Sequence, residues 1–142
     1  MSLSHQLLPS HGSTAPTVPR PKVAQEAAVL TVQDGLPIYY SDDTSPVSAV
    51  RVVHPTNPKA PSKNHSIVML YLPPHAEMEL HAHETEETYV ILSGTGTMLR
   101  NGGNCDVGPG TFIYMPAWCD HGIKNTGTEM LTILLATSPP NP

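Results

Sequence analysis

Apolar residues in this chain occur in short runs, which are separated by clusters of proline, glycine and small polar residues. Short runs rich in Val, Ile, Leu and Tyr are typical of β-strands. Polar or proline-broken segments at residues 41–46, 55–63, 102–104 and 108–110 are expected to form turns and loops. We expect strands at residues 27–33, 37–40, 47–54, 65–72, 78–83, 88–92, 96–101, 105–107, 111–115, 122–125 and 129–137.

This pattern predicts an all-β sandwich or barrel with about ten short strands. The chain contains 16 prolines and 10 glycines, which leaves little room for long helices. We find no internal repeat, so the pattern indicates a single barrel rather than a duplicated one. We assign residues 25–142 to this barrel.

Residues 1–24 have a different composition, in which serine and proline are frequent. Such a segment cannot form a core of its own, and we expect an extended arm. Two interpretations stay open. The arm is either a disordered tail or a segment that lies over a partner subunit, with Leu7 and Leu8 as its anchor.

The chain has 142 residues, which is the length of one domain that can bury a core without disulfides. Charged residues make up 13% of it and the net charge is −5, so we expect no basic patch for nucleic acid. There is no apolar run of membrane-spanning length and no secretory signal, so we expect a cytoplasmic protein without a membrane partner. Cys105 and Cys119 form no C-x-x-C pair, and we expect buried, reduced thiols.

The clearest chemical signal is residues 81–94, HAHETEETYVILSG. His81 and His83 are two residues apart, and residues i and i+2 of a strand point to the same face. Glu87 follows a short polar turn and would open a returning strand. Two imidazoles and a carboxylate from one hairpin would form most of a divalent metal site. Imidazole suits Zn, Cu, Fe and Ni, and the carboxylate extends this range towards Mn.

A further histidine, His121, lies downstream in residues 110–125, GTFIYMPAWCDHGIKN. It follows a strand-like run, a proline and a short turn. An antiparallel barrel could bring it beside His81, His83 and Glu87 as the missing ligand.

At these residues the sequence resembles the cupin superfamily. The first cupin motif is G-x5-H-x-H-x3-E-x6-G. It matches at His81, His83, Glu87 and Gly94, while His75 stands in place of the opening glycine. A lone H-x-H would be a weak signal, whereas the full motif at this spacing is a specific one.

The second cupin motif is G-x5-P-x-G-x2-H-x3-N. It matches at Gly110, Pro116, His121 and Asn125, while Trp118 stands in place of the inner glycine. The flanking strands extend the resemblance to most of the chain. The two glycine replacements leave the ligand positions intact and bear on the shape of the pocket mouth.

The resemblance implies a double-stranded β-helix, or jelly-roll, barrel that forms a homodimer. It implies one divalent ion per chain, Fe, Mn, Ni or Zn, with His81, His83, Glu87 and His121 as its ligands. Four protein ligands on an octahedral ion leave two positions open, where a small oxygen-rich anion could bind.

Similar small cupins include dioxygenases, isomerases, decarboxylases and lyases, so the resemblance implies a metal-dependent enzyme without selecting among these reactions. The alternative is a non-enzymatic module that binds or senses a small molecule. A structural role similar to that of seed-storage cupins ranks last, because those proteins are usually duplicated.

Strand parity places Tyr89 and Ile91 on the face of Glu87, and Glu79 on the face of His81. Tyr89 is therefore the candidate catalytic residue, because its hydroxyl could donate a hydrogen bond to a ligand or move a proton. The alternative is a core tyrosine bonded to the backbone.

Other residues near the motifs have two interpretations each. Trp118 could cap the pocket mouth or pack at a subunit interface. Met98 and Tyr114 could form pocket walls or belong to the core. Arg51 and Arg100 could bind an anionic substrate or lie at the surface.

Overall fold

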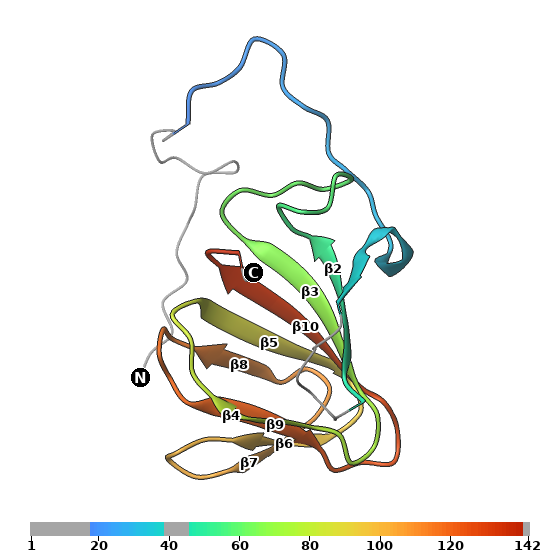
Figure 1. The fold of residues 1–142 in the computed structure, drawn as a ribbon, viewed down its shortest axis with the longest axis vertical. Helices are drawn as coiled ribbons and strands as arrows, with labels where there is room; N and C mark the ends of the chain where they lie inside the picture. Colours follow the sequence, from blue (N-terminus) through green and yellow to red (C-terminus); the bar gives the residue numbers. More distant parts are fainter. Residues whose placement is uncertain (1–17, 39–45, 141–142) are drawn as a thin grey trace, which may run out of the picture.

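Two antiparallel sheets form the barrel in this computed structural model, which describes residues 18–38 and 46–140 (Figure 1). The larger sheet has the order β1-β2-β3-β10-β5-β8, and the smaller sheet has the order β4-β9-β6-β7. The fold is therefore an all-β jelly roll, as the sequence predicts. The strands are β1 (Leu36–Ile38), β2 (Ser48–Val53), β3 (Ser66–Leu72), β4 (Glu77–His81), β5 (Glu86–Ser93), β6 (Gly96–Leu99), β7 (Cys105–Val107), β8 (Phe112–Met115), β9 (His121–Asn125) and β10 (Leu131–Ser138).

The core follows from the two-residue period of the strands. Along β3, buried and half-buried residues alternate without a break, and β10 does the same as far as Thr137. Leu70, Leu72 and Ile133 are fully buried in the hydrophobic core. Burying a side chain of this size is worth about 1.5–3 kcal/mol, so the centre of the larger sheet is the stable part of the scaffold.

Strand pairing does not follow the sequence order around the candidate site. β4 pairs with β9 in the smaller sheet, whereas β5 pairs with β10 and β8 in the larger sheet. The expected hairpin of residues 78–92 is therefore wrong, because the connection after β4 crosses from one sheet to the other. His83 lies in that connection, two residues beyond the end of β4.

The strand expected at residues 27–33 is also wrong. Residues 18–31 belong to no strand, and Figure 1 shows them lying apart from the two sheets before the chain reaches the short 3-10 helix η1 (Val32–Asp34). The valines of this segment are exposed, and Val29 is 96% exposed. The expected anchors Leu7 and Leu8, and the expected turn at residues 41–45, lie outside the described residues.

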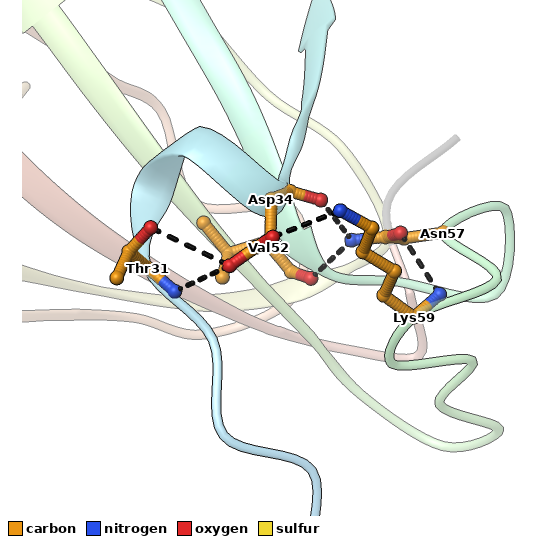
Figure 2. A network of polar contacts seen from close by, with 5 residues as sticks. All are labelled: Thr31, Asp34, Val52, Asn57 and Lys59. Carbon is orange, nitrogen blue, oxygen red and sulfur yellow. Dashed lines mark hydrogen bonds and ion pairs between the residues drawn. The ribbon is translucent and has the colours of Figure 1, made fainter.

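A polar network joins η1 to the loop after β2 (Figure 2). The backbone N–H of Thr31 donates to Asp34 Oδ2 at 2.9 Å, and Lys59 Nζ donates to Asp34 Oδ1 at 2.8 Å. Asn57 Nδ2 donates to the carbonyls of Val52 at 2.8 Å and Asp34 at 3.2 Å. Because the Lys59 hydrogen bond favours the carboxylate, the pKa of Asp34 lies below its ordinary value. The network fixes where the chain enters the larger sheet.

Two residues that replace motif glycines have a left-handed backbone. His75 has φ 71° and Trp118 has φ 65°. Each is the third residue of a tight turn: Ala76 N–H donates to Pro73 O at 3.0 Å, and Cys119 N–H donates to Pro116 O at 3.2 Å. Turns with positive φ at this position favour glycine. Both turns therefore keep the left-handed conformation that a motif glycine would adopt.

Two further expectations can be compared with the structure. No helix within the described ranges has the length and hydropathy of a membrane span. Both cysteines are free, but Cys105 is exposed and Cys119 is half-buried, so the expectation of buried thiols is wrong for Cys105 and met only in part for Cys119.

Candidate metal centre

Three histidines from two parts of the chain lie together where β4 ends and β9 begins. His81 ends β4 and is paired in register with His121, which begins β9, while His83 comes from the connection after β4. One ring nitrogen from each lies within 4.8 Å of those from the other two. The ring centres of His81 and His121 are 4.4 Å apart, and those of His83 and His121 are 4.9 Å apart. The cluster is compatible with a metal site.

The backbone fixes the tautomer of all three rings. Nδ1 lies 2.7 Å from the carbonyl of Glu79 in His81, 2.8 Å from that of Thr85 in His83, and 2.9 Å from that of Cys119 in His121. A carbonyl can only accept, so each Nδ1 carries the proton and donates. The lone pair of each imidazole is then on Nε2, which is how a histidine is prepared to bind a metal.

Glu87 completes the group from the start of β5. Its side chain is 3% exposed, with Oε1 3.5 Å from His121 Nε2 and Oε2 3.8 Å from His83 Nε2. Two atoms that each lie about 2.1 Å from a zinc-like ion can be at most about 4.2 Å apart. Both separations are within that limit and are long for hydrogen bonds.

Two buried atoms of this group have no hydrogen-bond partner among the described residues: Glu87 Oε1 and His121 Nε2. A buried carboxylate oxygen or imidazole nitrogen left in this state costs about 1–3 kcal/mol or more. A divalent cation bound to both atoms would satisfy them at once, so the residues present fit a metal ion.

The charges of the site act on His121. Burial acts to lower its pKa, but the Glu87 carboxylate, the Cys119 carbonyl and the charge of Asp120 outweigh burial and raise the pKa above its ordinary value. The pKa of the Cys119 thiol is raised, first because burial disfavours the charged thiolate and then because Asp120 and Glu87 are negatively charged. Its Sγ lies 3.9 Å from His121 Nδ1, away from the nitrogen that faces the cluster. Cys119 is thus a neutral thiol beside the candidate metal centre.

Tyr89 and Ile91 share the inward face of β5 with Glu87, as parity predicts, and each is 1% exposed. The ring centre of Tyr89 lies 6.2 Å from that of His121, at an interplanar angle of 80°. Parity is a poor guide on β4, because the pairing with β9 is irregular between Met78 and His81. The Glu79 side chain is exposed, and its contribution is the carbonyl that holds His81.

A second group of predicted residues surrounds a pocket beside His121. Arg100, Trp118 and Met98 line it, together with Tyr114, whose exposed side chain donates to Glu86 Oε1 at 2.5 Å. Met98 is buried and Tyr114 is not a core residue. Arg51 does not line this pocket; it lies half-buried on β2, beyond β3 and β10 from the site.

Asn125 of the second motif has a structural role. It is fully buried, and its Nδ2 donates to the carbonyls of Leu72 at 2.7 Å and Glu129 at 2.8 Å.

Sequence reasoning missed the carbonyls of Glu79, Thr85 and Cys119, which orient the three rings. Residue types carry no signal for backbone acceptors, although each carbonyl lies two residues from its histidine.

Comparisons with known proteins identify a matching family and two relatives. The model of the cupin domain family matches residues 68–137, which include all four candidate ligands. An uncharacterized protein of Methanocaldococcus jannaschii is 32% identical over 113 residues, which cover 79% of this chain and 87% of that protein. Auxin-binding protein 1 of Arabidopsis thaliana is 36% identical over 76 residues, which cover 47% of this chain and 38% of that protein.

Among solved structures, the polyketide cyclase RemF from Streptomyces resistomycificus has a similar fold. The TM-score is 0.68 at 16% identity, and the match covers 80% of each chain. At this identity the likeness shows the fold alone.

Proposed function

The chain belongs to the cupin superfamily, and we propose that it is a metal-dependent enzyme acting on a small anionic metabolite. His81, His83, Glu87 and His121 would hold one divalent ion, Fe, Mn, Ni or Zn. The observation that supports this most directly is the buried, unpartnered pair Glu87 Oε1 and His121 Nε2. A cation between these atoms would remove the cost of leaving them unpaired.

When bound, the ion would supply Lewis-acid chemistry, which stabilises negative charge on an oxygen of the substrate. The remaining work belongs to the chain. The carbonyls that accept from the three Nδ1–H groups orient the imidazoles and direct each Nε2 lone pair to the cluster. Buried Met115, which is paired in register with Glu87, helps to keep water out of the interior beside that carboxylate. Tyr89 would donate a hydrogen bond to the bound anion or transfer a proton.

Metal analysis of matched variants tests the ligand set. Protein purified without chelators and then supplied with Mn, Fe, Ni or Zn should carry about one ion per chain. Glu87→Gln should lower occupancy sharply, because it removes the charged ligand. Glu84→Gln, an exposed acid in the same connection, should retain the ion. Parent protein that binds none of these metals would refute the proposal.

A non-enzymatic small-molecule binder is the second candidate, and the likeness to a protein named for auxin binding favours it. A substrate panel on metal-loaded protein separates the two functions. Turnover that Tyr89→Phe abolishes while the metal is retained supports the enzyme. A ligand that raises the melting temperature without turnover supports the binder.

A further inference from the structure

A cavity of about 430 Å³ opens beside His121, between β6, β8 and the turn that leads into β9. Pockets of about 300–1,000 Å³ are the size that holds small organic ligands. His121 belongs both to this cavity and to the histidine cluster. A ligand in the cavity can therefore extend towards the candidate metal centre.

The less exposed part of the lining is apolar and rich in sulfur. It consists of buried Met98 and Met115 with half-buried Ile113 and Cys119. Apart from His121, none of these side chains offers a strong hydrogen-bonding group. A sugar or another polyhydroxylated ligand would lose its bonds to water there without gaining replacements, at about 1–3 kcal/mol for each group. Methionine sulfur, in contrast, makes favourable contacts with aromatic rings.

Trp118 adds an aromatic surface to the same cavity. Its indole is 67% exposed, although its backbone has the left-handed conformation that bulky residues rarely adopt. The backbone N–H donates to the carbonyl of the candidate ligand His83 at 2.8 Å, which fixes the position of the turn. Strained residues of this kind cluster at ligand sites, and an indole stacks well on a planar ring.

Apart from His121, the polar side chains lie in the exposed part of the lining. Asn101 Nδ2 donates to Asp120 Oδ2 at 2.5 Å, so these two side chains pair with each other. Arg100 uses Nε to bind the carbonyl of Gly103 at 3.0 Å, and within residues 18–38 and 46–140 it forms no ion pair. Arg100 and Asp120 thus place one positive and one negative charge at the exposed part of the cavity, so the attraction for an anion would come from an ion at the metal centre.

We propose that this cavity binds the ring of an aromatic carboxylic acid, whose carboxylate reaches the metal centre. The proposal rests on the metal site proposed above. The ring would lie on Trp118 and against Met98, Ile113 and Met115, and the carboxylate would meet the positive charge of the ion. This ligand class differs from the sugars and small polar acids that the ligand set alone would admit.

Four probes test the proposal on zinc-loaded protein: phenylacetate, acetate, phenylacetamide and gluconate. Trp118 is the single tryptophan of the chain, so its fluorescence reports occupancy of the cavity. Calorimetry provides the affinities. Phenylacetate should bind at least about tenfold more tightly than each of the other three, because it alone offers both the ring and the carboxylate without hydroxyls.

Two variants localise the effect. Trp118→Gly should weaken phenylacetate binding by about tenfold and leave acetate unchanged. Phe112→Ala, which removes a similarly exposed aromatic ring from β8 outside the cavity, should change neither. Zinc binding with no preference for phenylacetate would overturn this proposal alone. Failure to bind zinc would overturn it together with the proposed function.

Discussion

The left-handed turn residue His75 provides a quantitative test of the backbone argument. A left-handed conformation costs a non-glycine residue about 1–2 kcal/mol, and glycine brings about 0.5–1 kcal/mol of extra backbone entropy to the unfolded state. His75→Gly should therefore stabilise the barrel by about 0.5–1 kcal/mol. The side chain is exposed, and its backbone N–H donates to the carbonyl of Asn125 at 3.2 Å, so the substitution keeps the turn in place.

Unfolding of the metal-free protein in urea and by heat measures this effect. The melting temperature should rise by about 2–3 °C, as expected for a chain of this size. His75→Ala is the matched control, since it removes the imidazole and keeps Cβ, and it should stay within about 0.5 kcal/mol of the parent. A glycine variant no more stable than the alanine variant would refute the strain argument.

A substitution that should lower the free energy of unfolding provides a comparison for the stabilising one at His75. Gly94 also has positive φ, 83°, and a Cβ there would lie 2.5 Å from Met130 O and 2.9 Å from Leu131 Cα. Gly94→Ala combines backbone strain with a backbone clash, so it should cost at least about 2 kcal/mol. A smaller loss would mean that the turn between β5 and β6 relaxes easily.

Two further predictions concern pH and assembly. Because metal binding needs neutral imidazole and the pKa of His121 is raised, zinc affinity should fall as pH decreases, beginning above the ordinary histidine pKa of about 6.5; a chelator-competition titration that is flat from pH 8 to 6 would contradict this. In the metal-free protein the sign is opposite: the raised pKa stabilises the fold at low pH, and this contribution is lost as pH rises through the folded-state pKa. The chain should form a homodimer, and deletion of residues 1–22 should weaken it if the arm, with its exposed Val18, covers a partner. Unchanged size and melting after deletion would favour a tail without contacts.

The strands that sequence predicted well are those whose partners bury one face. β3 and β10 alternate because they lie side by side at the centre of the larger sheet, so local pattern and tertiary burial agree. Residues 27–33 have similar local preferences but gain no pairing partner. Whether a segment forms a strand depends on its neighbours in the fold. The composition of residues 27–33 could not reveal that a neighbouring strand is absent there.

The candidate site was predictable in its members and not in its geometry. Spacing identified His81, His83 and Glu87, but the i, i+2 argument assumed one strand and one hairpin. In the structure His83 has left the strand, and Glu87 approaches from the other sheet. The crossing between sheets is a long-range property, and adjacent sequence favours the simpler hairpin. The sequence offered Met98, Tyr114 and Trp118 as pocket residues, and they line the cavity beside His121, but local pattern could not show that β6, β8 and a turn form one wall.

Trp118 is where stability and binding should oppose each other. It has the same left-handed strain as His75 and replaces the other motif glycine, but it lines the cavity, whereas His75 does not. Trp118→Gly should therefore stabilise metal-free protein by a similar amount, about 0.5–1 kcal/mol, while weakening the binding of phenylacetate to the zinc-loaded form. His75→Gly should stabilise without any change in binding. This contrast separates two reasons for losing a motif glycine: a neutral replacement tolerated at an exposed turn, and a strained residue retained for its side chain. If Trp118→Gly is stabilised and binds phenylacetate as the parent does, the indole has no role in the cavity and the second reason fails.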